Sequence, residues 1–194
     1  ETLAVLTFAY PAGTQNTTAR IQVTAEERNG ADSDTTNTIL VPFPCDGQTN
    51  CPSHAFCDLN GTMWYHEYTD FVLENGLMNG MGNGIFQPNG SLTRGMLITT
   101  LYRLAGAPAV SGTSAFADVK AGTYYADAVT WGAENGIVKG VTDAHFCPNT
   151  PVTSEQAATF LYRYVVNYLG QEPASGSDLS IFRDAGKISD YARE

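Results

Sequence analysis

The sequence predicts an α+β chain, mainly α-helical, in which tandem helix–loop–helix repeats pack pseudo-symmetrically after a small β-rich segment. Three observations support this fold class. A block of sequence within residues 56–163 occurs twice at a constant offset, and apolar residues in both copies recur at helical spacing. Residues 19–24, in contrast, alternate with the period of two that is typical of a β-strand.

The repeat is defined by ordered motifs that both copies share without an insertion between them. Because a unit that recurs at a fixed period buries its apolar face against its neighbours, we expect the copies to pack on each other. We also expect a third copy to begin at Phe182 and to stop inside its first helix at Glu194. The matching motifs are Phe56-Cys57-Asp58 with Phe116-Ala117-Asp118, Glu74-Asn75-Gly76 with Glu134-Asn135-Gly136, Phe86-Gln87-Pro88-Asn89 with Phe146-Cys147-Pro148-Asn149, and Leu101-Tyr102-Arg103 with Leu161-Tyr162-Arg163.

The first helix of each copy is expected over residues 64–75 and 124–135. Gly76 and Gly136 follow these segments and predict left-handed C-terminal ends, since glycine adopts a positive φ without a steric penalty. The preceding aspartates, Asp58 and Asp118, are interpreted as caps of the turn before the helix. The expected helix face of copy one comprises Tyr65, Tyr68 and Val72.

The second helix of each copy is expected to open at Thr93 or Thr153, whose hydroxyl groups can cap the first turn. Thr153 with Gln156 three residues later makes a capping box. The expected apolar faces of these helices comprise Leu97, Leu101 and Leu104 in copy one and Ala157, Leu161, Val165 and Leu169 in copy two.

Residues 1–44 differ in character from the repeats, because they are rich in β-forming residues and turns. We expect strands over residues 3–10, 19–24 and 35–41, which form the end of a β-sandwich. The predicted division of the chain is therefore a partial β-sandwich at 1–44, a linker with a disulfide at 45–55, repeats at 56–110 and 111–170, and a linker with the start of a third repeat at 171–194.

Composition and motifs exclude several classes of function. The net charge of −10 and pI near 4.6 argue against nucleic acid or an anionic membrane as partner. No apolar run approaches the roughly 18 residues of a membrane span. Neither a Gly-x-Ser-x-Gly motif nor another catalytic set is present, and Glu74 and Glu134 occupy equivalent repeat positions rather than forming an acid/base pair. We therefore expect neither catalysis nor a cofactor.

The four cysteines are interpreted as disulfide partners in an exported protein. Cys45 and Cys51 would close a short loop, and Cys57 and Cys147 are each an extra cysteine within a repeat, which suggests that they meet. Four cysteines allow three connectivities, so the pairing stays open. A zinc site is disfavoured, because the sequence has no C-x-x-C and its histidines (His54, His66 and His145) show no ligand spacing to the cysteines.

The ordered motifs resemble the S-layer homology (SLH) module. The likeness extends over residues 116–163 of copy two and, slightly less closely, over copy one. It implies a helical prism of pseudo-threefold symmetry that anchors exported bacterial proteins to the cell wall. The β-rich residues before the repeats resemble the last strands of cohesin-type surface β-sandwich modules.

The SLH resemblance also implies a ligand, a secondary cell-wall polysaccharide that often carries pyruvylated sugars, bound in grooves between repeats. The family's Thr-Arg-Ala-Glu motif is Thr93-Arg94-Gly95-Met96 in copy one and Thr153-Ser154-Glu155-Gln156 in copy two, so that only copy one keeps the arginine. Arg94 is expected to clamp a carboxylate, with a helix-surface charge as the alternative. Trp64 and Trp131 are candidates for stacking on a sugar, with burial as the alternative. The expected ligand-binding residues are Thr93, Arg94, Gly84, Trp64, Trp131 and Glu155.

The leading functional hypothesis is thus a non-catalytic carbohydrate-binding anchor outside a Gram-positive cell, at the cell wall or S-layer. The alternative is a structural or protein-interaction segment with degenerate repeats and little affinity for glycans. An unfinished third repeat leaves an apolar face open, which predicts self-association or reduced stability.

Overall fold

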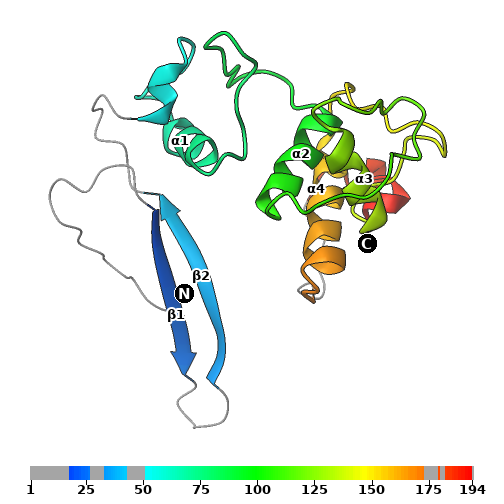
Figure 1. The fold of residues 1–194 in the computed structure, drawn as a ribbon. Helices are drawn as coiled ribbons and strands as arrows, with labels where there is room; N and C mark the ends of the chain where they lie inside the picture. The colour runs from blue at the N-terminus through cyan, green and yellow to red at the C-terminus, as the bar shows by residue number, and fades with distance from the viewer. Residues whose placement is uncertain (1–17, 27–32, 43–50, 173–178, 180–181, 194) are drawn as a thin grey trace, which may run out of the picture. The chain divides into compact units, whose positions relative to one another are not determined.

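A computed structural model describes residues 18–26, 33–42, 51–172, 179 and 182–193, with side chains from residue 51 onward (Figure 1). The chain divides into two compact units, Glu1–Pro88 and Asn89–Glu194. The boundary falls inside the first predicted repeat. The second helix of copy one therefore belongs to the same unit as all of copy two, while the repeat boundaries themselves stay predictions.

The first unit contains an antiparallel pair of strands, β1 (Thr18–Glu26) and β2 (Ser33–Pro42). Both are longer than the predicted segments 19–24 and 35–41. Ile21 pairs with Ile39, and the register shifts between Val23 and Ala25. The strand predicted over residues 3–10 lies outside the described residues, so the β-sandwich stays a prediction.

The helical part of the first unit consists of the short 3₁₀ helix η1 (Pro52–Ala55) and helix α1 (His66–Glu74). Helix α1 begins two residues later than predicted, because Trp64 and Tyr65 lie in a turn in which the His66 N–H donates to the Met63 carbonyl. The helix ends at Glu74, and its C-cap Asn75 is followed by Gly76, whose φ of +64° confirms the predicted left-handed end.

The second unit is a helical body (Figure 1). Its helices are α2 (Arg94–Leu104), α3 (Ala126–Glu134) and α4 (Ser154–Arg163), which continues into the π-helical turn η2 (Tyr164–Tyr168), followed by the 3₁₀ helices η4 (Ala185–Lys187) and η5 (Asp190–Ala192). Helix α2 packs against α3, and α4 packs against η5. In both cases the second helix of one copy meets the first-helix region of the next copy. None of the helices in the described part of the chain is long and apolar enough to span a membrane.

Helix capping in the second unit follows the prediction. The Thr93 hydroxyl accepts the Met96 N–H, and Thr153 forms the complete capping box with Gln156. These side chains satisfy backbone donors that the first helical turn leaves without intrahelical partners.

The core of the second unit lies between α2, α3 and α4. Its largest fully buried side chains are Ile98, Val129, Ile137 and Phe146, and the indole of Trp131 packs against the rings of Tyr102, Tyr164 and Tyr168. The predicted apolar faces were partly wrong, since Tyr68, Leu104, Leu161 and Leu169 are exposed. The buried face of α4 instead carries Phe160 and leads to Tyr164, because these rings contact the aromatic core.

Each copy contains a long-range aspartate clamp, which corrects the predicted local role of Asp58 and Asp118. The Asp58 carboxylate accepts the backbone N–H groups of Phe86 and Gln87 at 2.9 and 2.7 Å. The Asp118 carboxylate accepts those of Phe146 and Cys147 at the same distances. Gln87 and Cys147 have positive φ angles of 62° and 58°, so each carboxylate stabilises a strained turn far along the chain.

Gly132 allows the close approach of α2 and α3. A Cβ atom at this position would lie 2.7 Å from Ile98 Cδ1 and 3.0 Å from Ile98 Cγ1. We predict that Gly132→Ala lowers the free energy of unfolding by about 1–3 kcal/mol through overpacking, measured by urea denaturation. Gly186→Ala is the control, because a Cβ atom at Gly186 would meet nothing within 4 Å, and it should change stability by less than about 0.5 kcal/mol. Equal stabilities of the two variants would contradict this packing.

The Asp118 clamp predicts a pH dependence of stability. Burial raises the pKa of Asp118, but the N–H donors of Phe146 and Cys147 outweigh it and hold the pKa below the ordinary value of 3.8. Because the folded-state pKa is depressed, the contribution is complete above pH 3.8 and is lost as the pH falls through the lower, folded-state pKa. Asp118→Asn should cost about 1–2 kcal/mol at neutral pH and progressively less in acid. Urea unfolding of both proteins across this range measures the difference, and a pH-independent difference would refute the clamp.

Candidate functional site

Arg94 is the first residue of α2 and lies directly after the capping residue Thr93. Its side chain is drawn into the second unit, and the residue is only 4% exposed. The guanidinium carbon lies 4.6 Å from the ring centre of Phe146 and 5.1 Å from that of Phe160. Cation–π contacts of this kind are stronger when the cation is desolvated.

The Arg94 guanidinium donates hydrogen bonds to neutral oxygen atoms of copy two. Nε donates to the Phe146 carbonyl and Nη2 to the Lys139 carbonyl, both at 2.9 Å, while Nη1 lies 3.5 Å from Gln156 Oε1. Burial lowers the pKa of Arg94, an effect that nearby Cys147, Tyr191 and Asp118 oppose. The group nevertheless stays charged, as arginine does in proteins.

This geometry differs from the open carboxylate clamp that the sequence predicts for Arg94. The alternative of a helix-surface charge is wrong, because the side chain is buried. The sequence could not show that Phe146 and Phe160 would enclose the guanidinium. In this structure Arg94 joins the second helix of copy one to the 139–146 loop of copy two.

The backbone around Arg94 reinforces the same junction. The N–H groups of Arg94 and Gly95 donate to the carbonyls of Thr150 and Pro148, and the Val152 N–H donates to the Leu92 carbonyl. A Cβ atom at Gly95 would lie 3.0 Å from the Pro148 oxygen. The small residue at this position therefore permits the close approach of the loop.

Glu155 is the copy-two counterpart of Gly95 and binds the third copy instead. Its carboxylate accepts the Ser189 N–H at 3.0 Å, the Ser189 hydroxyl at 3.1 Å and the Tyr191 hydroxyl at 2.9 Å. The Ser189 N–H, followed by the Tyr191 hydroxyl, lowers the pKa of Glu155. Glu155 was predicted as a ligand-binding residue, and its described contacts are to the chain itself.

Two further predicted residues, Trp64 and Gly84, belong to the first unit. Trp64 is 79% exposed, with its ring edge-to-face against Tyr65 at 5.8 Å and tilted against Tyr68 at 6.5 Å. Gly84 has a φ of +71°, and its carbonyl accepts the Cys57 N–H. Trp131, in contrast, is 4% exposed in the second unit, which confirms the core interpretation over sugar stacking.

The expected bridge between Cys57 and Cys147 is wrong, because both cysteines are free. Each is held within its own copy instead. The Cys57 N–H donates to the Gly84 carbonyl, whereas the Cys147 N–H donates to the Asp118 carboxylate. Cys51 is disulfide-bonded. Cys45 lies outside the described residues, so the Cys45–Cys51 pairing stays a prediction.

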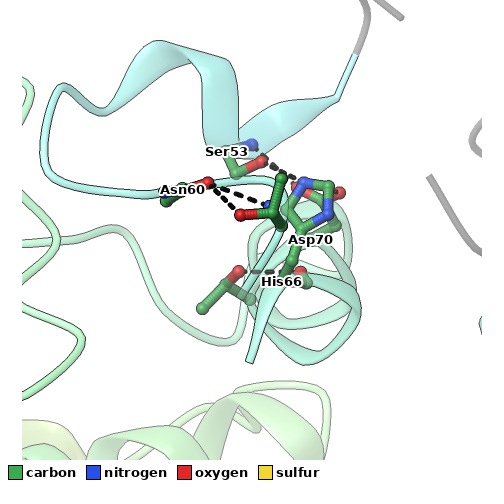
Figure 2. A network of polar contacts seen from close by, with 6 residues as sticks. Ser53, Asn60, His66 and Asp70 are labelled. Atoms are coloured by element: carbon green, nitrogen blue, oxygen red, sulfur yellow. Dashed lines mark hydrogen bonds and ion pairs between the residues drawn. The ribbon is translucent and has the colours of Figure 1, made fainter. Parts of the chain in front are cut away.

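A buried polar cluster between η1 and α1 was not predicted (Figure 2). His66 Nε2 lies 2.9 Å from Ser53 Oγ and 3.2 Å from Asp70 Oδ2, and the Ser53 N–H donates to Asp70 Oδ1 at 2.8 Å. Both His66 contacts fall on one ring nitrogen, so this is not the relay of a Ser-His-Asp catalytic triad. The sequence does contain a hint of this cluster, because His66 and Asp70 stand on one helical face where copy two has Ala126 and Thr130.

Comparison with known proteins identifies the repeats. The family model of the S-layer homology domain matches residues 55–95 and 115–158. The "Surface-layer 125 kDa protein" of Lysinibacillus sphaericus is 32% identical over 155 residues, which cover 79% of this chain and 12% of that protein. The "Endoglucanase" of Bacillus sp. (strain KSM-635) is 29% identical over 158 residues, covering 80% of this chain and 16% of that protein.

A third relative extends the same pattern. The "Surface layer protein" of Brevibacillus choshinensis is 32% identical over 103 residues, which cover 51% of this chain and 9% of that protein. The chain thus spans less than a fifth of the length of each of these relatives. Residues 55–95 and 115–158 of this chain are therefore repeats of the S-layer homology domain family.

Proposed function

We propose that this chain is a non-catalytic anchor that binds secondary cell-wall polysaccharide, with pyruvylated sugars as the preferred ligand. The observation that carries the proposal is the match of two successive repeats to the S-layer homology domain. The chain acts outside the cell, at the cell wall or S-layer, in keeping with its surface-layer and cell-wall relatives.

The variety of the relatives supports a module that is separate from any catalytic activity. Similar segments occur in surface-layer proteins and in proteins named "Endoglucanase" and "Amylopullulanase", where they make up 16% and 7% of the length. A segment shared by proteins with such different names is expected to serve what they have in common. We infer attachment to the cell surface.

The contacts of Arg94 suggest how an acidic chain binds an anionic sugar. At a net charge of −10, a carboxylated ligand needs a locally placed cation. Arg94 fixes the Lys139 carbonyl, and the Lys139 residue itself is exposed. In our proposal Arg94 positions the loop, while the Lys139 ammonium contacts the pyruvyl carboxylate.

The remaining predicted residues have supporting roles in the proposal. Thr93 fixes the start of α2, and Glu155 holds Ser189 and Tyr191 of the third copy. On the first unit, the exposed indole of Trp64 can stack on a sugar ring, and Gly84 holds the Cys57 backbone through its carbonyl. Trp131 supports the binding surface only through the core.

Binding to purified wall sacculi tests the role of Lys139. Lys139→Met should reduce retention of the chain by about 10-fold or more, since it removes a charge-assisted hydrogen bond. Chemical removal of pyruvate from the sacculi should abolish the difference between variant and parent. Lys120→Met, at another exposed lysine, is the control and should bind like the parent. Retention that is indifferent to pyruvate and to Lys139 would contradict glycan anchoring.

We expect the substitution of Arg94 to act on the stability of the fold, and to weaken wall binding only as a consequence. Arg94→Met leaves the Phe146 and Lys139 carbonyls without their donors and should cost about 2–4 kcal/mol in urea unfolding. Lys120→Met should cost less than about 0.5 kcal/mol. A loss of wall binding in Arg94→Met with unchanged stability would mean that the guanidinium contacts ligand directly.

The second candidate function is a protein-interaction segment. The observation in its favour is that Phe182 and Tyr191 of the third copy are 54% and 41% exposed. Under this alternative, copies of the chain associate with one another through the Phe182 and Tyr191 rings. Sedimentation of the parent and of Phe182→Ser distinguishes it, because only an apolar contact would weaken with the substitution.

A further inference from the structure

We propose that Asn89 is a site of spontaneous modification, at which the Asn89-Gly90 linkage converts in water to aspartate and isoaspartate. The site lies on the main chain just before α2, and its chemistry does not depend on glycan binding. The dipeptide Asn-Gly recurs in the described part of the chain, so the local structure determines which pair reacts. The pairs are Asn60-Gly61, Asn75-Gly76, Asn79-Gly80, Asn83-Gly84, Asn89-Gly90 and Asn135-Gly136.

The reaction joins the asparagine side chain to the backbone of the next residue. The Gly90 nitrogen attacks the side-chain carbonyl carbon of Asn89, a new C–N bond closes a five-membered imide, and the bond to Nδ2 breaks with loss of ammonia. Water then opens the imide at either carbonyl and leaves aspartate or isoaspartate. The net change exchanges one ammonia for one water, without electron transfer. Glycine favours ring closure because it has no Cβ atom and its backbone rotates most freely.

The two pairs at helix C-termini are locked at both reacting groups. The Nδ2 atom of Asn75 donates to the Phe71 carbonyl at 2.8 Å, and the Gly76 N–H donates to the Leu73 carbonyl. The pair that begins with Asn135, at the end of α3, makes the same two contacts. Because the leaving group and the attacking nitrogen are both held, ring closure requires the helix end to open first.

The Asn60 side chain is held by the turn that it starts. Its Oδ1 atom accepts both the N–H and the hydroxyl of Thr62 at 2.9 Å, beside the His66 cluster (Figure 2). Rotation of this side chain breaks both bonds, which restrains the approach of its carbonyl carbon to the Gly61 nitrogen.

The two pairs of the 79–85 loop are held through the backbone. A Cβ atom at Gly80 would lie 2.7 Å from the Ile85 oxygen, and the same oxygen accepts the Met81 N–H at 2.7 Å. The Ile85 N–H donates to the Gly82 carbonyl, so that the loop is a closed turn. The movement of the glycine nitrogen that ring closure needs is therefore restrained in both pairs.

Asn89-Gly90 has none of these restraints. Asn89, Gly90 and the following Ser91 are all exposed. Within the part of the chain that the structure describes, neither Asn89 nor Gly90 has a hydrogen-bond partner. Both the amide side chain and the attacking nitrogen are therefore free to reach the geometry of ring closure.

The second copy shows what a restrained chain looks like at the same position. The counterpart of Gly90 is Thr150, whose N–H donates to the Cys147 carbonyl at 3.2 Å and whose carbonyl accepts the Arg94 N–H at 3.0 Å. Copy one thus has the reactive glycine where its backbone takes no part in the junction. Conversion at Asn89 adds a negative charge, and isoaspartate also adds a methylene to the main chain.

Incubation of the purified full chain in mildly alkaline buffer measures the reaction, with fragment-ion mass spectrometry to resolve each asparagine. Alkaline buffer speeds ring closure because the attacking nitrogen must lose its proton. Asn89 should deamidate about 10-fold or more faster than Asn75 and Asn135, because the helix ends must open locally before they react. Labelling with an isoaspartyl methyltransferase identifies isoaspartate at position 89.

Two controls separate the effect of the fold from that of the dipeptide. In concentrated urea, which unfolds the chain, the same Asn-Gly pairs should react at similar rates. Gly90→Thr, which gives copy one the residue of copy two, should suppress the reaction at Asn89 and leave the other pairs unchanged. The proposal is overturned if Asn89 in the folded chain reacts no faster than Asn75 and Asn135, or if the same ranking persists in urea.

Discussion

The buried guanidinium of Arg94 is the interaction on which the second unit depends. It lies beside two phenyl rings and donates to two backbone carbonyls of the following copy. Because those carbonyls belong to the two ends of the 139–146 loop, one side chain fixes both its start and its end. The junction explains why the second helix of copy one forms a compact unit with copy two rather than with its own first helix.

Repeat proteins are stabilised mainly by contacts between neighbours, and this chain shows how one repeated position can serve different junctions. Gly95 lets a loop carbonyl approach closely, whereas Glu155, its counterpart, binds Ser189 and Tyr191 through its carboxylate. The residue that replaces the family motif at this position in each copy therefore suits the segment that packs against it. The same departures were interpreted from sequence only as lost ligand-binding groups.

Local features of the fold could be predicted from the sequence, because their causes are local. The capping residues Thr93 and Thr153 and the left-handed Gly76 and Gly136 act within one helical turn, so spacing alone identified them.

The burial of Arg94 and the clamps of Asp58 and Asp118 depend instead on partners far along the chain. The polar cluster around His66 likewise needs Ser53 and Cys51 to come near α1, which no periodicity indicates. The family and the helices could therefore be predicted from the sequence. The long-range contacts that define the roles of Arg94, Asp58 and Asp118 could be recognised only in the structure.

Hydrogen exchange of backbone amides at the junction tests the central role of Arg94 most directly. In the parent chain the N–H groups of Gly95 and Val152, which donate to Pro148 and Leu92, should be strongly protected. In Arg94→Met their protection should fall together, while amides inside α3 keep more of theirs. Unchanged protection of Gly95 and Val152 in the variant would contradict this role of Arg94, because the loop would then be held without the guanidinium.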